Sequence, residues 1–201
     1  VGSTFKPFLY TLAMQEGAAT GEFSPCTEVP NISVSIELPD GNYWTPRNSS
    51  RDREGEMVTL KWALANSVNW VSAYLMKRFS PLAVIQMTER MGITSEIDPV
   101  PAIALGTPDI SVFEMVGAMN TFANKGIHVN PYYITHIKDK YGNVLATFAP
   151  TSNEAMNEET AYLMLNLMQG VVESGTGIRL RYKYGFNNEI AGKTGTTQNQ
   201  S

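Results

Sequence analysis

The first six residues, Val1-Gly2-Ser3-Thr4-Phe5-Lys6, constrain the fold most, because they place a serine and a lysine three positions apart at the start of an apolar run. If this run is a helix, Ser3 and Lys6 share one face, one turn apart. A serine hydroxyl is a poor nucleophile until a base takes its proton. A lysine amine can do so when burial or a cationic neighbour lowers its pKa. The chain therefore needs a fold that surrounds Lys6 with such an environment.

Two later stretches, Ser67-Val68-Asn69 and Lys193-Thr194-Gly195, would complete a site around this pair. Each pattern is weak alone: chance gives roughly one Ser-x-x-Lys in a chain of this length, and Ser and Asn are ordinary turn residues. Lys-Thr-Gly could simply be the end of a strand. Each pattern nevertheless occurs once here, on the kind of element that its chemistry requires, so we interpret the three together.

The hydroxyl and carboxamide of the second stretch suit proton transfer and substrate binding. Ser67, on a loop between two helices, can relay a proton between Lys6 and a leaving amine. The carboxamide of Asn69 offers both a donor and an acceptor, which suits a substrate amide.

The third stretch suits an anionic group. Lys193 and the hydroxyls of Thr194 and Thr196 can bind a substrate carboxylate, and a second lysine beside Lys6 would depress its pKa by repulsion. The backbone N–H groups of Ser3 and Thr196 could form an oxyanion hole, where each donor contributes about 2.7–4 kcal/mol. An edge strand at 190–197 could also pair with an extended peptide.

The periodicity predicts an α-rich α+β fold. Helices are expected over about Ser3 to Glu16 with Gly17 as the stop, Thr59 to Asn66, Trp70 to Met76, a segment capped by Ser80 with Pro81 next and Gly92 past its end, Ser111 to about Asn124, and Glu158 to Glu173, with a turn at Ile178 to Tyr182. Strands are expected within Ile32 to Leu38, in a hairpin over Ile127 to Phe148, and over Ile190 to Thr197.

Composition excludes several classes of protein. The formal net charge of −4 argues against a nucleic-acid binder, and no apolar run reaches the roughly 18–20 residues of a membrane helix. Cys26 is the only cysteine, so an internal disulfide and a cysteine-based metal cluster are excluded. His128 and His136, the only histidines, lack the helical spacing of a zinc motif.

Longer stretches resemble the transpeptidase domain of class A penicillin-binding proteins, whose signature joins the three motifs in this order. The stretches are GSTFKPF at 2–8, VTLKWALANSVN at 58–69, ALGTPDISVFEMVGAMNTFANKG at 104–126, GTG at 175–177 and GKTGTT at 192–197. The resemblance covers essentially the whole chain. It implies one domain over residues 1–201, a mostly helical core with an incomplete antiparallel sheet. Relative to the family, we expect this domain to be truncated at both ends, in a piece of a longer protein that could be inactive alone.

The resemblance also implies a function. Family members are cell-wall enzymes outside the cytoplasmic membrane that use no metal or cofactor. The serine, here Ser3, is acylated by the penultimate D-Ala of a peptidoglycan stem peptide, D-Ala leaves, and an amine of a second stem peptide takes the acyl group. β-Lactam antibiotics trap the serine. Ser3, Lys6 and Ser67 would be catalytic, and Asn69 and 193–196, Gly195 included, would bind substrate.

Alternatives remain within and outside this family. A DD-carboxypeptidase or a β-lactamase would use the same motifs. A class A β-lactamase also needs a glutamate between the second and third motifs, whereas we interpret Glu154 to Asn157 as a helix cap. Outside the enzymes, the alternative functions are a β-lactam sensor and a non-catalytic structural module. A Ser-His-Asp triad is disfavoured, because Lys6 fills the role of the base and neither histidine has a carboxylate-oriented setting.

Overall fold

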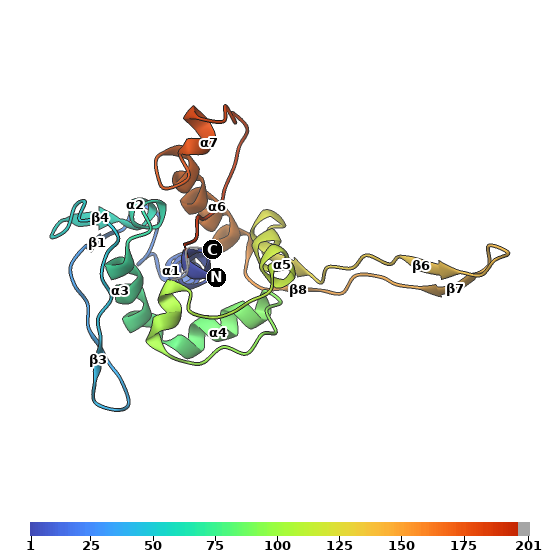
Figure 1. Cartoon of the computed structure of the whole chain (residues 1–201), viewed down its shortest axis with the longest axis horizontal. Helices are drawn as coiled ribbons and strands as arrows, with labels where there is room; N and C mark the ends of the chain where they lie inside the picture. Colours follow the sequence, from blue (N-terminus) through green and yellow to red (C-terminus); the bar gives the residue numbers. More distant parts are fainter. Residues whose placement is uncertain (197–201) are drawn as a thin grey trace.

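The computed structural model describes residues 1–196 and confirms the α+β class. The helices are α1 (Lys6–Thr20), α2 (Leu60–Ala65), α3 (Asn69–Phe79), α4 (Pro81–Arg90), α5 (Val112–Ala123), α6 (Glu158–Glu173) and α7 (Arg179–Tyr182), with 3-10 helices η1 (Gly2–Phe5) and η2 (Pro101–Leu105). In Figure 1 helices α2 to α6 lie around α1, and α7 lies beyond α6. Within residues 1–196, no helix is both long and apolar enough to cross a membrane.

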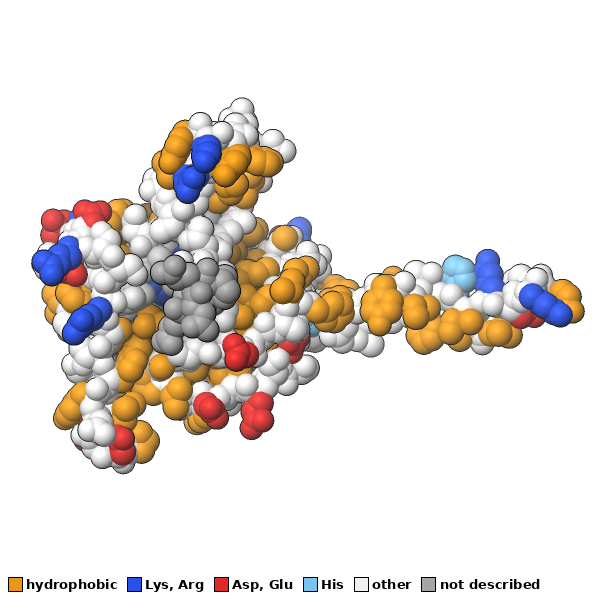
Figure 2. Space-filling view, viewed as in Figure 1, with side chains coloured by type: hydrophobic (Ala, Val, Ile, Leu, Met, Phe, Trp, Pro, Cys, Tyr) orange, Lys and Arg blue, Asp and Glu red, His pale blue; other side chains and the backbone are white. Residues whose placement is uncertain are grey.

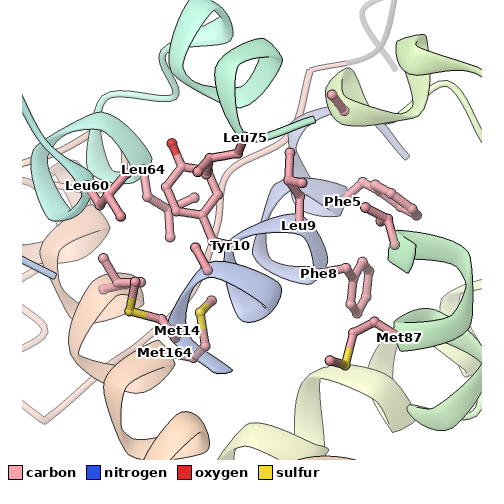
Figure 3. Packing of buried hydrophobic residues seen from close by; sticks show 14 of the residues in the cluster. Phe5, Phe8, Leu9, Tyr10, Met14, Leu60, Leu64, Leu75, Met87 and Met164 are labelled. Atoms are coloured by element: carbon pink, nitrogen blue, oxygen red, sulfur yellow. The ribbon is translucent and has the colours of Figure 1, made fainter. Parts of the chain in front are cut away.

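Helix α1 is the centre of the core. Its side chains are buried on nearly every side, as expected of a helix that is apolar all round. Figure 3 shows this packing: Phe8, Leu9, Tyr10 and Met14 of α1 meet Leu60 and Leu64 of α2, Leu75 of α3, Met87 of α4 and Met164 of α6. Each such fully buried side chain contributes about 1.5–3 kcal/mol. The helix that begins with Lys6 is thereby fixed on all sides.

The end of α1 differs from the prediction. Gly17 does not stop the helix, which continues to Thr20 and ends at Gly21 in the left-handed conformation (φ 76°). Gly17 is instead needed for close packing, because a Cβ there would lie 1.8 Å from the carbonyl oxygen of Phe23. The returning chain therefore crosses the helix directly over this glycine.

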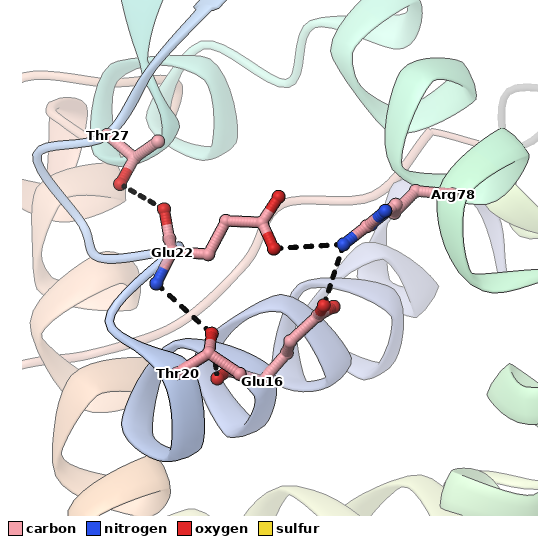
Figure 4. A network of polar contacts seen from close by, with 5 residues as sticks. All are labelled: Glu16, Thr20, Glu22, Thr27 and Arg78. Atoms are coloured by element: carbon pink, nitrogen blue, oxygen red, sulfur yellow. Dashed lines mark hydrogen bonds and ion pairs between the residues drawn. The ribbon is translucent and has the colours of Figure 1, made fainter.

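A polar contact joins the end of α1 to α3 (Figure 4). Arg78 Nη2 of α3 lies 2.8 Å from a carboxylate oxygen of Glu16 and 2.9 Å from one of Glu22. Because the three side chains are partly exposed, these ion pairs contribute little stability, about 0–1 kcal/mol each.

Local capping explains several helix starts. Thr59 Oγ1 accepts the N–H of Trp62 at the start of α2, and Ser111 forms a capping box with Glu114 at the start of α5, as predicted. Asn157 accepts the N–H of Thr160 at the start of α6, so the interpretation of Glu154 to Asn157 as a cap is confirmed. Ser80 precedes α4, but its side chain makes no capping hydrogen bond, so that part of the prediction is wrong.

The strands are short and form two-stranded antiparallel sheets: β1 (Glu28–Pro30) with β4 (Met57–Thr59), β2 (Ile36–Glu37) with β3 (Tyr43–Trp44), β5 (Ile127–Val129) with β8 (Ser152–Glu154), and β6 (His136–Lys138) with β7 (Val144–Thr147). Of the strand expected within residues 32–38, the structure forms only the two residues of β2. The predicted hairpin is present with its turn at 140–143, but Ile127 to Val129 pairs beyond it, with β8.

Residues 130–151, which we call the arm, extend the β6–β7 hairpin away from the body (Figure 1). Almost every residue of the arm is exposed. Figure 2 shows hydrophobic side chains along its visible length, and Tyr133, Tyr141 and Leu145 are among the most exposed, at 87%, 77% and 66%.

The last predicted strand is not formed. Residues 190–196 carry no strand assignment, and Thr197 lies outside the described residues. A strand needs a neighbouring strand for its hydrogen bonds. Among the described residues, no strand pairs with residues 190–196.

Candidate active site

The first two motifs meet at the amine of Lys6. Its Nζ donates to the carbonyl oxygen of Ser67 at 2.6 Å and to Oδ1 of Asn69 at 2.7 Å, and lies 3.2 Å from the hydroxyl of Ser67. Lys6 is fully buried although it is charged in water. These contacts join residues that are 61 and 63 positions apart in the sequence.

Lys193 approaches Ser67 from the other side. Its Nζ donates to the Ser67 hydroxyl at 3.0 Å and to the carbonyl oxygen of Thr194 at 3.0 Å. The Thr194 hydroxyl is hydrogen-bonded to that of Thr176, whose backbone N–H donates to Ala65 at 3.0 Å. The Ser67 hydroxyl thus lies between two lysine amines.

Burial lowers the pKa values of both lysine amines, and repulsion from Lys193 lowers that of Lys6 further. Burial, and secondarily the charge of Lys193, lower the pKa of Lys6 well below its ordinary value. Burial also lowers the pKa of Lys193, to about 8. Within residues 1–196, neither amine forms an ion pair with a carboxylate that would oppose these shifts. Both lysines are therefore easier to deprotonate than lysines in water.

A neutral Lys6 fits this geometry. A neutral amine has two N–H groups and one lone pair. The carbonyl of Ser67 and the Oδ1 of Asn69, the two shortest contacts, are acceptors that can take both N–H groups. The lone pair then remains for a hydroxyl proton. Ser67 can provide one while its own oxygen accepts from Lys193.

Ser3 lies in η1, immediately before α1, and is half-buried. In the described part of the chain its hydroxyl has no hydrogen-bond partner, and its carbonyl accepts the N–H of Lys6. Two glycines allow this turn to pack tightly. Gly2 has φ +60° and donates its N–H to Gly106 at 2.9 Å, and a Cβ on Gly106 would lie 1.7 Å from the carbonyl oxygen of Gly2.

The 193–196 segment runs beside this turn. A Cβ on Gly195 would lie 2.8 Å from the side chain of Thr4, and one on Gly2 would lie 2.6 Å from the carbonyl oxygen of Thr196. The backbone of Thr196 is therefore a neighbour of the residue that precedes Ser3. The segment of the third motif thus lies beside both the turn that contains Ser3 and the hydroxyl of Ser67.

Some residues around the site were not predicted. The carbonyl of Arg47 accepts Nδ2 of Asn69 at 2.6 Å, and Oδ1 of Asn48 accepts the backbone N–H of Asn69 at 3.0 Å. Both residues lie in the stretch GNYWTPRN at 41–48, whose aromatic, turn-rich sequence fits a packed surface loop and a substrate-facing loop equally well. Thr176 was noted as part of the resemblance, but without a role.

Neither histidine belongs to the site. His128 is buried in β5, between Thr121 and Asn130, and His136 lies in the arm. The described residues also hold no cluster of three or more His, Cys, Asp or Glu side chains that could bind a metal ion.

An apolar groove of about 860 Å³ lies between α5, α6 and the 189–195 segment. Its lining includes Met115, Val116, Met119, Leu165, Ala191 and Lys193, but none of Ser3, Lys6, Ser67 and Asn69. The groove adjoins the candidate site without containing its reactive groups.

The family model described as the penicillin-binding protein transpeptidase domain matches residues 1–201. The chain belongs to this family. The relatives of this penicillin-binding transpeptidase domain include penicillin-binding protein 1A of Neisseria lactamica, 35% identical over 202 residues that cover 98% of the chain and 25% of the relative. The chain thus spans about a quarter of the length of such curated relatives.

Solved structures share the fold of this transpeptidase-family chain. Penicillin-binding protein 1A from Haemophilus influenzae superimposes with a TM-score of 0.86 at 23% identity, covering 98% of this chain and 34% of that one. Penicillin-binding protein A from M. tuberculosis, solved as an imipenem acyl-enzyme complex, has a TM-score of 0.75 at 22% identity, with coverages of 98% and 48%.

Proposed function

We propose that this chain carries the acylating centre of a peptidoglycan DD-transpeptidase, with Ser3 as the nucleophile. One observation carries the proposal: in a member of this family, the hydroxyl of Ser67 lies between the amines of Lys6 and Lys193, and Lys6 follows Ser3 by three positions, with its backbone N–H donating to the carbonyl of Ser3. The substrate would be a stem peptide ending in D-Ala-D-Ala, and the product a cross-link in the cell wall.

In the proposed acylation, the neutral amine of Lys6 takes the proton of the Ser3 hydroxyl while Oγ attacks the carbonyl carbon of the penultimate D-Ala. The oxyanion accepts hydrogen bonds from the backbone N–H groups of Ser3 and Thr196. When the intermediate collapses, the C–N bond breaks. The departing D-Ala amine takes a proton from Ser67, which regains one from Lys6.

The acyl group then moves to a second stem peptide. Its amine attacks the ester carbonyl and loses a proton to Ser67, which passes one to Lys6. The ester C–O bond then breaks, the new amide bond remains, and Lys6 returns a proton to Oγ of Ser3. Water in place of the amine would make the protein a DD-carboxypeptidase.

Substrate binding uses the remaining hydrogen-bonding capacity of the site. Lys193, Thr194 and Thr196 bind the terminal carboxylate, beside the backbone of Gly195. Asn69 retains one N–H and one lone pair beyond its contacts with Arg47 and Lys6, which leaves a donor and an acceptor for a substrate amide.

The proposed partners and location follow the family. β-Lactam antibiotics would acylate Ser3, as the imipenem acyl-enzyme of the M. tuberculosis relative illustrates. The reaction would take place at the outer face of the cytoplasmic membrane, where peptidoglycan is cross-linked.

The position of Glu154, the candidate for the water-activating glutamate, argues against a β-lactamase. Glu154 lies exposed in β8, paired with Ile127 of β5, and makes no hydrogen bond to a residue of the candidate site. Within the described residues, no carboxylate contacts Lys6, Ser67 or Lys193 that could activate water for deacylation. The acyl group should therefore leave slowly.

The test is intact-mass spectrometry of the chain after incubation with benzylpenicillin. We expect one adduct, mapped to Ser3 and stable over repeated sampling, and its loss in Ser3→Ala. Ser35→Ala, which changes a loop serine outside the site, is the matched control and should label normally. An adduct that persists in Ser3→Ala would refute the nucleophile, and rapid turnover of the drug would indicate a β-lactamase.

A further inference from the structure

Helix α3 begins with Asn69 but has no cap of its own. The residue before it, Val68, makes no side-chain capping hydrogen bond. The first N–H groups of a helix need acceptors. Here the carboxamide oxygen of Asn48, 21 positions earlier, accepts the N–H of Asn69 at 3.0 Å and that of Trp70 at 3.1 Å. Asn48 is therefore the cap of α3, supplied from a distant loop.

The carboxamide of Asn48 is itself oriented. Its Nδ2 donates to Oδ1 of Asn31 at 3.1 Å, and Asn31 is fully buried. The Nδ2 of Asn31 donates in turn to the carbonyl of Arg53 at 2.8 Å and lies 3.3 Å from that of Asp52. Both ends of the Asn48 amide are thus engaged, so turning it over would break hydrogen bonds at each end.

The neighbours of Asn48 complete a clamp on the start of α3. The carbonyl of Arg47 accepts Nδ2 of Asn69, and the carbonyl of Pro46 accepts Nε1 of Trp70 at 2.9 Å. Residues 46–48 therefore bind both the backbone and the side chain of Asn69. The remaining end of that side chain, Oδ1, faces the amine of Lys6.

We propose that Asn48 is a positioning residue for the acylation, holding Asn69 and, through it, the amine of Lys6 in place. The inference rests on the proposed function of Lys6 as the base. Asn48 lies outside the three motifs. Simple capping of α3 predicts no change in the pKa of Lys6 when Asn48 is replaced, whereas the proposed positioning role predicts one.

The test compares two caps. Asn48→Ala removes the cap of α3, and Asn157→Ala removes that of α6. Among the described residues the Asn157 side chain accepts a hydrogen bond from Thr160 and makes none to a residue of the candidate site. Each change should reduce thermal stability through loss of an asparagine cap, and Asn48→Ala more so, because it also removes the donor to Oδ1 of the buried Asn31. Both proteins are measured well below their unfolding temperatures.

The first readout is the titration of Lys6, followed by NMR of lysine labelled with 13C at Cε and assigned by the loss of its signal in Lys6→Met. In Asn48→Ala, the charged amine loses a firmly held acceptor, so we expect Lys6 to titrate at lower pH than in the wild type. In Asn48→Asp, which keeps the acceptor and adds a negative charge, we expect it to titrate at higher pH. Asn157→Ala should leave it unchanged.

The second readout is the rate of acylation by a chromogenic cephalosporin across pH. Asn48→Ala should lose roughly tenfold to a hundredfold at the plateau, because a misplaced base is inefficient. Its rising limb should move with the titration of Lys6. Asn157→Ala should keep the wild-type rate and profile.

The outcomes separate the two proposals. If Asn48→Ala behaves like Asn157→Ala in both readouts, Asn48 is only a cap and the inference is wrong. If Ser3 of the wild type is not acylated, the proposed function fails, but the titration of Lys6 still decides whether Asn48 controls that amine.

Discussion

The amine of Lys193 shows how one buried charge links the site to stability. Burial lowers its folded-state pKa to about 8, whereas an unfolded lysine titrates near about 10.4. Between these values the unfolded chain binds more protons than the folded one, so the free energy of unfolding rises with pH. Below about pH 8 both states are protonated, and the folded state bears the full cost of the buried charge.

We therefore expect the wild type to gain stability between about pH 8 and about pH 10, and Lys193→Met to gain less. Denaturant unfolding at each pH measures the difference. Lys77→Met, which removes an exposed lysine of α3, is the control and should keep the wild-type rise. Equal slopes for wild type and Lys193→Met would contradict the burial of this charge.

Single residues also show what the sequence could not predict. Ser3, Lys6, Ser67, Asn69 and Lys193 were found because their spacing carries a chemical pattern. Asn48 was not, since it caps a helix that starts 21 positions later and no local rule joins the two. The buried state of Lys6 was expected only as a requirement of its chemistry.

At the scale of elements, the helices with local start signals were predicted well. Thr59, the Ser111–Glu114 box and Asn157 act within three residues of their own positions, so the sequence displays them. Two failures depend on contacts that the local pattern does not show. The strand expected at 190–197 would need a neighbour to pair with, and Gly17 lies inside α1 against the backbone of Phe23, while the helix ends at Gly21.

Two helical glycines test this distinction. Helix propensity alone predicts that Ala in place of Gly stabilises a helix interior by about 1 kcal/mol. At Gly170 of α6 a Cβ would come closest to the flexible side chain of Lys61, at 3.1 Å, with Ala65 in ordinary contact at 3.7 Å, whereas at Gly17 it would meet backbone at 1.8 Å. We expect Gly17→Ala to destabilise the protein by about 1–3 kcal/mol.

Gly170→Ala is the matched control and should be neutral or slightly stabilising. Thermal and denaturant unfolding of the two variants measure both effects. If Gly17→Ala raised the free energy of unfolding, the chain near Phe23 would have to move away at little cost, and helix propensity would outweigh the steric clash.

At the scale of the whole molecule, the body and the arm differ in how they are stabilised. Helix α1 is enclosed by the other helices, whereas the arm holds only a two-stranded ribbon with exposed side chains. A two-stranded hairpin is at best marginally stable in water. The arm therefore contributes little to the core, although it contains many apolar residues.

Hydrogen exchange should reveal this division. We expect amides of β6 and β7 to exchange by local opening, far faster than those of α1 and α6, which exchange only on global unfolding. Peptide-resolved exchange by mass spectrometry measures both in one experiment. Protection of β6 and β7 equal to that of α1 would indicate that the arm folds cooperatively with the body.

The position of the arm in the chain has a further consequence, which concerns loop closure. Lys193 meets Ser67 across 126 positions, and residues 130–151 lie within that interval. The entropy of closing a loop depends only on the logarithm of its length, so adding the arm raises the cost of bringing Lys193 to Ser67 by only about 0.2 kcal/mol. Because this increment is so small, the length and sequence of the arm can change while the geometry around Lys6 stays the same.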